Sequence, residues 1–271
     1  GGPSGAARFG QPHPGVDVPS IKDGVAQLGG VASMGIDGTL SIRKGFPYGE
    51  FIQQCWFISK VTVVPVILTS IPFGVIIALH AGSIAKQIGA ESHIGALMVL
   101  AVVRESAPVT TALLISGAGG SAMTADLGSR RIRSELDAME VMGVDPIHRL
   151  VLPRLAAATL VAILLNGIVS AAGIIGGWVM AVPIQNGTTG AYFASFTELA
   201  QLWDFGQALI KAAIFGFLAA AISCHYGYNV KGGPKSVGDA VNRAVVLTFI
   251  LLFFVNFIIT AMYFNLVPAK L

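Results

Sequence analysis

The sequence predicts an all-α, polytopic membrane protein with an N-terminal interfacial elbow helix and five transmembrane helices. Hydrophobic residues make up 54% of its 271 residues, and charged residues make up only 11%. Soluble domains carry roughly 25% charged residues. Mean hydropathy is +0.74. Once the apolar spans are subtracted, only short loops and an N-terminal arm remain, so a separate catalytic domain does not fit.

The first 60 residues are expected to precede the spans. Residues 1–19 are rich in glycine and proline, which indicates a flexible N-terminal segment. Residues 20–60 mix apolar and basic positions and form a predicted amphipathic interfacial region. Its aromatic part around Phe51, Trp56 and Phe57 is typical of an elbow helix lying in the membrane interface. We therefore do not expect this part to cross the bilayer.

Residues 61–271 form the predicted five-helix transmembrane domain. A helix of about 20 apolar residues spans the roughly 30 Å of hydrocarbon in a bilayer. Pro65 and Pro72 are expected to bend the first span, and Lys211 is placed at the entrance of the fourth. The predicted spans are residues 61–79, 94–125, 155–184, 212–226 and 244–267.

The distribution of lysine and arginine predicts the orientation of the spans, because cytoplasmic loops carry an excess of these residues. Thirteen of them fall in the N-terminal arm, the second loop and the fourth loop, against three on the opposite face, which are Lys86, Lys211 and Lys270. We therefore expect the N-terminus inside and the C-terminus outside, in a multi-pass protein of an inner or plasma membrane. The basic residues form no continuous face, so nucleic acid is not an expected partner.

Small residues inside the second and third predicted spans are interpreted as helix-packing positions, where two backbones can approach closely. Gly117-x-Gly119-x-x-Ala122 matches a dinucleotide fingerprint only superficially, because it lies in a span without a βαβ pattern. The packing positions are Gly117, Gly119, Gly120, Gly173 and Gly177.

Motifs for ATP binding and for catalysis do not occur in the sequence. It lacks a Gly-x-x-x-x-Gly-Lys-Ser/Thr loop, which would cradle nucleotide phosphates. The five histidines and two cysteines are scattered without the spacing of metal ligands. We therefore expect a non-enzymatic chain that itself binds no cofactor and no metal.

The second loop carries a predicted amphipathic helix at about residues 132–143. Leu136 and Met139 recur at helical spacing on one face, and acidic residues occupy the remaining faces. Ser134 is placed to cap the helix, and Gly143 is placed to stop it. Taken by itself, such a helix is compatible with a solvated connector. The acidic residues are Glu135, Asp137 and Glu140.

Arg104 and Glu105 lie in the interior of the second span, where charged side chains are expensive. Neighbouring helix positions point about 100° apart, so we expect each side chain to find its own partner across the bundle or in a wet cavity. The pair is compatible with a structural ion-pair network at a dimer seam. It is equally compatible with a substrate path, in which Arg104 contacts a lipid headgroup and helices bent at residues such as Pro108 enclose the tails.

Three segments resemble the MlaE/YrbE family of ABC-transporter permeases. The first is the run from Glu135 to Arg154, and the second is Arg104-Glu105-Ser-Ala-Pro108-Val-Thr-Thr-Ala-Leu-Leu. The third begins Lys211-Ala-Ala-Ile-Phe-Gly-Phe and continues to Gly238. The resemblance covers about residues 50–265, and the sequence looks most similar to the YrbE permeases of actinobacterial Mce lipid importers.

The resemblance implies a lipid or fatty-acid transporter assembled from several subunits. The expected partners are a second YrbE-type permease in a heterodimer, a cytoplasmic ABC ATPase dimer that binds ATP and Mg, and MCE-domain substrate-binding proteins on the outer face. Ala118 and Asn256 depart from the family pattern, where arginine and aspartate are common. A second interpretation is an ion- or proton-coupled secondary transporter or channel, in which Arg104 and Glu105 relay protons or ions.

The resemblance also implies that the helix of the second loop is a coupling helix. Its apolar ridge would seat in a groove of the ATPase while its acids meet basic residues at the rim. The residues expected to take part are Glu135, Leu136, Asp137, Met139, Glu140, Met142 and Gly143.

Overall fold

The computed structural model describes residues 21–266, and within that range every regular element is helical. The predicted flexible segment of residues 1–19 lies outside the described residues. Five helical stretches of the described part are long and apolar enough to cross a membrane, which confirms the predicted number of spans. They are Tyr48–Gln87, Ile94–Ile132, Ile147–Ile184, Leu202–Tyr228 and Pro234–Tyr263.

The N-terminal part differs from the predicted elbow. α1 (Ile21–Leu40) is a separate helix that ends in a 3-10 turn, and the chain breaks at Gly45, whose φ is 104°. α2 (Tyr48–Gln87) then runs without interruption through Trp56 into the first span. The segment around Phe51 and Trp56 is therefore not a separate elbow helix, because the break falls before it. The separate N-terminal helix is α1.

The second span is a continuous helix with two wider stretches. α3 (Ile94–Met98), α4 (Ala107–Leu114) and α5 (Ser121–Ile132) are joined by π-helical turns at Val99–Ser106 and Ile115–Gly120. Such turns are uncommon and often mark functional sites. The first of them contains Arg104 and Glu105, and the second contains the predicted packing glycines of this span.

The remaining elements complete the bundle. α6 (Glu135–Val141) is the predicted helix of the second loop, and a short helix, α8, occupies what the sequence suggested was a loop. Lys211 lies well inside the fourth span, so its prediction as an entrance residue was wrong; the helix already begins at Leu202. The other helices are α7 (Leu152–Val179), α8 (Thr189–Leu199), α9 (Leu202–Tyr228) and α10 (Pro234–Leu266).

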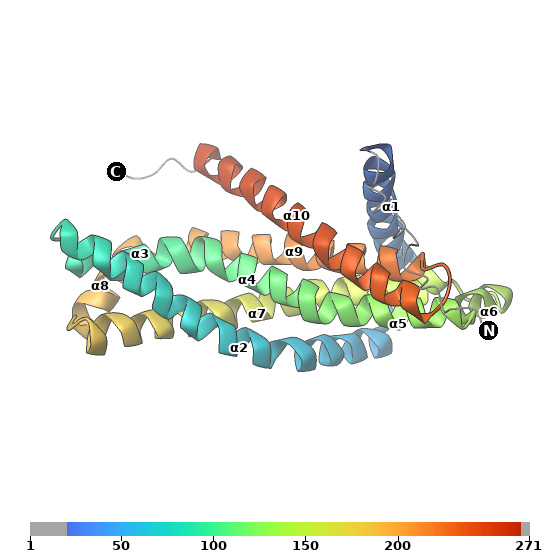
Figure 1. Cartoon of the computed structure of the whole chain (residues 1–271), viewed down its shortest axis with the longest axis horizontal. Coiled ribbons are helices and arrows are strands. Elements are labelled where there is room, and N and C mark those ends of the chain that lie inside the picture. Colours follow the sequence, from blue (N-terminus) through green and yellow to red (C-terminus); the bar gives the residue numbers. More distant parts are fainter. Residues whose placement is uncertain (1–20, 267–271) are drawn as a thin grey trace, which may run out of the picture.

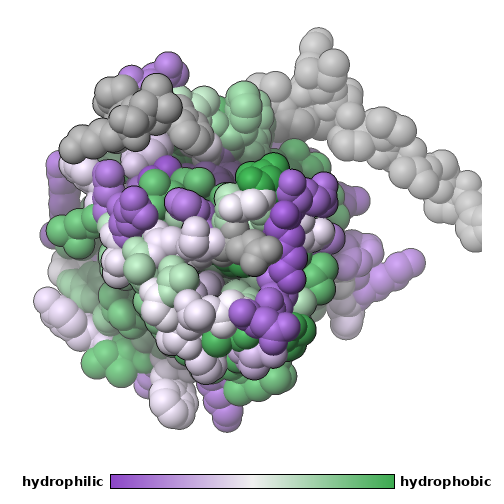
Figure 2. Space-filling view, turned by 90° about the vertical axis from the view of Figure 1, so that its left-hand side faces the viewer, coloured by the Kyte–Doolittle hydropathy of each residue, from purple (hydrophilic) through white to green (hydrophobic). Residues whose placement is uncertain are grey.

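The long helices run side by side along one axis, with α6 at one end and α8 at the other (Figure 1). α1 stands across this axis at the α6 end, and α10 crosses the bundle obliquely so that its C-terminal half diverges from the other helices (Figure 1). At the α8 end, hydrophilic and intermediate residues occupy much of the surface and hydrophobic residues gather around the rim (Figure 2).

Glycines set the closest approach between α2 and α7. A Cβ added at Gly74 would lie 2.1 Å from the carbonyl oxygen of Gly173, and one at Gly176 would lie 2.4 Å from that of Ile71. A Cβ at Gly177 would lie 2.4 Å from Met98. Backbones this close are typical of membrane helices that pack through small residues. At Gly117, in contrast, an added Cβ would meet no described atom within 4 Å.

Candidate functional site

Arg104 and Glu105 pair with different residues, as their angular separation predicted. Arg104 Nε lies 2.8 Å from Asp204 Oδ1, and Glu105 Oε1 lies 2.9 Å from Lys211 Nζ. Both partners belong to α9. The expectation that each charge finds its own partner across the bundle is confirmed. Two ion pairs therefore connect the π-helical turn of the second span to the fourth span.

Asp204 joins three elements at the start of α9. Its side chain is 2% exposed, and its Oδ2 accepts a hydrogen bond of 3.0 Å from the backbone N–H of Gln201. Its Oδ1 accepts a second bond of 3.0 Å from the Tyr263 hydroxyl of α10. The Arg104 guanidinium also faces the Tyr263 ring, 5.9 Å from its centroid. A buried carboxylate is tolerated here because a cation and two donors satisfy it.

Lys211 is completely buried and is fully satisfied. Its ammonium group donates to Glu105 Oε1, to Thr260 Oγ1 at 2.8 Å and to the backbone carbonyl of Arg104 at 3.2 Å. A lysine has three donors, so every N–H has a partner. Asn256 Nδ2 donates to the other oxygen of Glu105 at 3.2 Å. We call Arg104, Glu105, Asp204, Lys211, Asn256, Thr260 and Tyr263 the charge network.

Sequence reasoning assigned a role in a site only to Arg104 and Glu105 of this charge network. Asp204 and Lys211 were missed because both were assigned outside the fourth span, Lys211 as a topology signal. Their spacing of seven residues places both on one face of a helix, which was a usable signal. Asn256, Thr260 and Tyr263 follow at steps of four and three and form a matching polar stripe on α10.

A lateral cavity of about 480 Å³ lies beside the charge network, between α2, α4 and α10. Glu105 and Asn256 of the charge network line it together with three hydroxyl side chains, and the other lining side chains are apolar. Pro108, which we expected in the substrate path, is buried in the first turn of α4, and its neighbour Val109 lines the cavity instead. The remaining lining residues are Thr69, Phe73, Ser106, Thr110, Leu113, Leu114 and Phe253.

α6 presents a different face from the one predicted. Leu136 is 0% exposed, so it packs inside this chain and is not available to a partner. The exposed apolar residues are Val141 at 89% and Met142 at 70%. Ser134 occupies the N-cap position but has φ 56° and makes no side-chain cap bond, so its predicted capping role was wrong. The apolar surface of this segment thus lies at its C-terminal end.

The acids of α6 have partners within the chain. Glu135 pairs with Arg133 at 2.8 Å, and Asp137 pairs with Arg131 at 2.5 Å. Glu140 accepts a hydrogen bond of 3.0 Å from the hydroxyl of Tyr228, the last residue of α9. These contacts fasten α6 to the ends of α5 and α9.

The loop after α6 is fastened to the junction between α1 and α2. Asp145 pairs with Lys44 at 2.6 Å, and His148 Nε2 lies 2.8 Å from the carbonyl oxygen of Gly45. Arg149 pairs with Glu50 at 2.5 Å. Burial raises the pKa of Asp145, but the bonds from Lys44 and from two backbone N–H groups outweigh it and hold that pKa below its usual value.

The fold and the site define a class: a multi-pass membrane protein whose spans enclose a buried charge network beside a lateral apolar cavity. Such intramembrane ionisable groups mark transport pathways in many membrane proteins. The family model described as permease MlaE matches residues 51–262. The chain belongs to the MlaE permease family, and it is the permease of an ABC-type transporter.

Relatives from distant organisms agree with this family. The chain is 31% identical over 227 residues to a "Probable ABC transporter permease protein" of Rickettsia bellii, covering 84% of this chain and 88% of that protein. It is 28% identical over 229 residues to the "Intermembrane phospholipid transport system permease protein MlaE" of Haemophilus influenzae, covering 84% and 87%. It is 30% identical over 179 residues to "Protein TRIGALACTOSYLDIACYLGLYCEROL 1, chloroplastic" of Arabidopsis thaliana, covering 66% and 51%.

Proposed function

We propose that this chain forms the transmembrane path of an Mce-like lipid importer and is driven by a separate ABC ATPase. The observation that carries the proposal is the lateral cavity of about 480 Å³ with Glu105 and Asn256 in its lining. Its volume and largely apolar lining suit a hydrocarbon chain, and we infer that a lipid enters it from the bilayer between α2 and α10, which both contribute to the lining. A phospholipid transport permease among its relatives supports a lipid as the cargo.

The charge network has a mechanical role in this proposal. It ties the second span to α9 through the ion pairs Arg104–Asp204 and Glu105–Lys211, and Lys211 also donates a hydrogen bond to Thr260 of α10. A lipid headgroup that approaches Arg104 competes with Asp204 for its guanidinium, because phosphate and carboxylate are bound by the same donors. Binding of the headgroup then loosens the contact between the second span and the start of α9. This provides a link between cargo and helix arrangement.

α6 is the element on which the ATPase acts in this proposal. Val141 and Met142 supply an exposed apolar contact, and Glu135 and Asp137 of α6 are held by arginines of its own chain. Because α6 is fastened to α5 and α9, a push on it moves those helices as rigid bodies. ATP and Mg bind to the ATPase partner, and no nucleotide binds to this chain.

The other proposed partners are a second YrbE-type permease in a heterodimer and MCE-domain proteins on the outer face. α10 supports a helix partner in the membrane, since only 11% of its most apolar stretch is buried within this chain, against 56% for α9. Its exposed large residues include Phe249, Phe253, Phe254 and Phe257. A second permease would cover part of this face and the mouth of the cavity.

Copurification with the ATPase tests the coupling role of α6. We expect Val141→Glu to abolish recovery of the ATPase with the permease, because it places a charge in the centre of the proposed contact. Leu202→Glu is the matched control, since Leu202 is 90% exposed at the opposite end of the bundle and Val141 is 89% exposed. Undiminished ATPase recovery with Val141→Glu, in a correctly folded complex, would contradict the coupling role.

The charge network also favours a second candidate, an ion- or proton-coupled secondary transporter or channel. Four ionisable residues, Arg104, Glu105, Asp204 and Lys211, form two adjacent pairs at membrane depth. Flux measurements on the permease alone in vesicles distinguish the candidates. A gradient-driven flux without the ATPase that is lost in Glu105→Gln would support the second candidate.

A further inference from the structure

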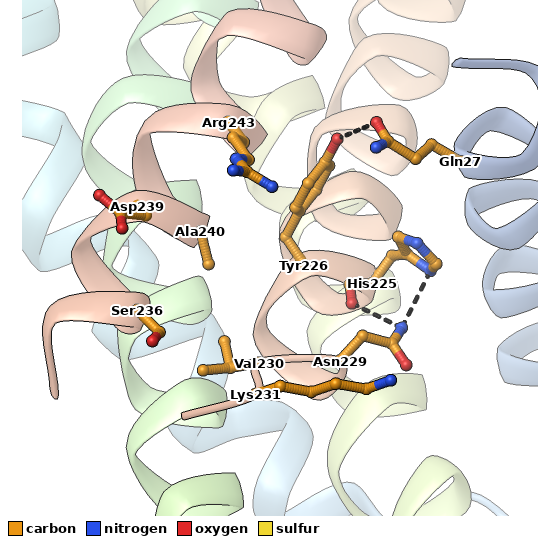
Figure 3. A pocket seen from close by; sticks show the side chains of 10 residues that line it. All are labelled: Gln27, His225, Tyr226, Asn229, Val230, Lys231, Ser236, Asp239, Ala240 and Arg243. Carbon is orange, nitrogen blue, oxygen red and sulfur yellow. Dashed lines mark hydrogen bonds between the residues drawn. The ribbon is translucent and has the colours of Figure 1, made fainter. Parts of the chain in front are cut away.

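A second pocket lies at the α6 end of the bundle, away from the lateral cavity. It has a volume of about 380 Å³ and is lined by α1, the C-terminal end of α9 with the loop that follows it, and the first turns of α10 (Figure 3). Polar and charged side chains dominate its lining. The end of the bundle on which it lies carries the loops predicted to be cytoplasmic.

α1 forms one wall of this pocket through specific contacts with α9. The Tyr226 hydroxyl donates a hydrogen bond of 2.8 Å to Gln27 Oε1 (Figure 3). A Cβ added at Gly30 would lie 2.4 Å from the His225 ring, so α1 approaches α9 closely at this glycine. Asn229 Nδ2 lies 3.3 Å from His225 Nδ1 and donates to the His225 carbonyl oxygen at 2.9 Å. The wall is therefore an ordered part of the fold.

The pocket has an excess of positive charge. Arg243 and Lys231 line it from two sides, and both are solvent-exposed (Figure 3). Within residues 21–266 neither of them has a carboxylate within 4.0 Å, although the arginines of α5 and α7 are paired. Asp239 is the one acid among the described lining residues, and its carboxylate points away from Tyr226 (Figure 3). Two unpaired cations in a concave site are suited to an anionic group.

An apolar groove of about 350 Å³ adjoins this pocket between the same three helices. On α9, Ala221 of the groove lies one helical turn from His225 of the pocket. On α1, Leu28 of the groove directly follows Gln27 of the pocket, and on α10 Leu251 lies about two turns beyond Arg243. The polar pocket and the apolar groove are therefore neighbours along the same three helices, and we treat them together as one composite site.

We propose that this composite site binds an anionic phospholipid of the bilayer, with its phosphate between Arg243 and Lys231 and one acyl chain in the groove. Basic pockets between membrane helices on the cytoplasmic side are suited to such headgroups. The groove excludes a purely soluble anion as the intended ligand, because a free phosphate would leave its apolar lining uncovered. The site is separate from the cavity at Glu105, so the lipid bound here is not the cargo and the inference does not rest on the proposed transport function.

The bound lipid would connect α1 to α10. α1 packs mainly on α9 and α7, so a lipid between α1 and α10 fills the space along its remaining side. Retention of this lipid would hold α1 in its transverse position beside the α6 end. Loss of the lipid would release α1 on that side without disturbing the charge network.

Native mass spectrometry of the full chain, purified with its partners in mild detergent, tests the proposal by counting retained phosphatidylglycerol. We expect Lys231→Gln combined with Arg243→Gln to retain one phosphatidylglycerol fewer per permease. Titration in nanodiscs should show affinity for that lipid reduced about 30-fold, as expected if each cation contributes about 1 kcal/mol. Lys235→Gln is the matched control, because Lys235 is exposed in the first turn of α10 and does not line the pocket.

A second variant tests the acyl-chain part of the site. Gly35→Leu places a side chain in the groove, where a Cβ would already lie 3.4 Å from Phe217, and should reduce lipid retention with both cations intact. Unchanged retention in the double glutamine variant would overturn the proposal. Displacement of the lipid by millimolar inorganic phosphate, together with full retention in Gly35→Leu, would assign the pocket to a free anion and would also overturn it.

Discussion

Neutralising Lys211 perturbs the charge network at its most buried point. Lys211→Met keeps the length of the side chain but removes the ammonium group, which leaves Glu105 without its cation at 2.9 Å. Removing one partner of a buried ion pair typically costs about 3–5 kcal/mol. Glu105 is 39% exposed toward the cavity and keeps donors from Asn256 and Thr260, so the loss should fall lower, at about 2–3 kcal/mol.

Substitution of Glu105, the other partner of this ion pair, should destabilise the protein more than substitution of Lys211. Glu105→Gln leaves Lys211, which is 0% exposed, as a buried cation with neutral acceptors only, namely the new amide oxygen, Thr260 and a backbone carbonyl. We expect the free energy of unfolding of this variant to fall by about 3–5 kcal/mol, because water cannot reach the Lys211 ammonium group. The double variant removes both charges. Its loss of stability should be about 2 kcal/mol smaller than the sum of the losses in the two single variants.

Denaturant unfolding of the purified permease in detergent, followed by tryptophan fluorescence, measures these differences. We expect Lys211→Met to be more stable than Glu105→Gln. We expect the double variant to lose less stability than the two single variants together. Additive losses, or a Glu105→Gln variant as stable as the wild type, would show that the pair is not energetically coupled. Lys86→Met serves as a control, since Lys86 lies in the last turn of α2 and has no ion pair among the described residues.

Two further predictions concern packing and pH. Gly74→Ala should destabilise by about 1–3 kcal/mol in the same assay, because its Cβ meets the Gly173 carbonyl at 2.1 Å. Gly167→Ala on α7, where nothing lies within 4 Å, should be neutral or stabilising. Asp145 has a pKa held below its unfolded value near 3.8, so its stabilisation is present above that value and is lost as pH falls through the folded pKa. Stability measured from about pH 5 to about pH 3 should therefore fall less steeply in Asp145→Asn, and an identical slope would contradict the assignment.

The number of spans could be predicted because each is an apolar run of sufficient length, and this information is local. The charge network could not be assembled in the same way, since the partners of Arg104 and Glu105 lie about 100 residues further along the chain. Counting Lys211 as a loop residue concealed its role. The positive-inside rule assigns every lysine near the end of a span to a loop at the membrane surface. Lys211 instead lies inside the bundle, where it binds Glu105 and Thr260.

Helical periodicity predicted α6, but it could not show which side of that helix packs inward. Leu136 seemed suited to a partner, yet the chain itself buries it and exposes Val141 and Met142. Aromatic residues similarly suggested an interfacial elbow around Trp56, although the helix break depends on Gly45 and Pro47, several residues earlier. In both cases, local composition identified a helix and tertiary packing decided its role.

Lipid transfer between vesicles tests the central claim most directly. The complete complex, reconstituted with its ATPase, should move fluorescent phospholipid only when ATP and Mg are supplied. The permease alone should move none, with or without an ion gradient. Equal lipid movement by the isolated permease, or movement driven by an ion gradient alone, would contradict the account of a path operated by a nucleotide-binding partner at α6.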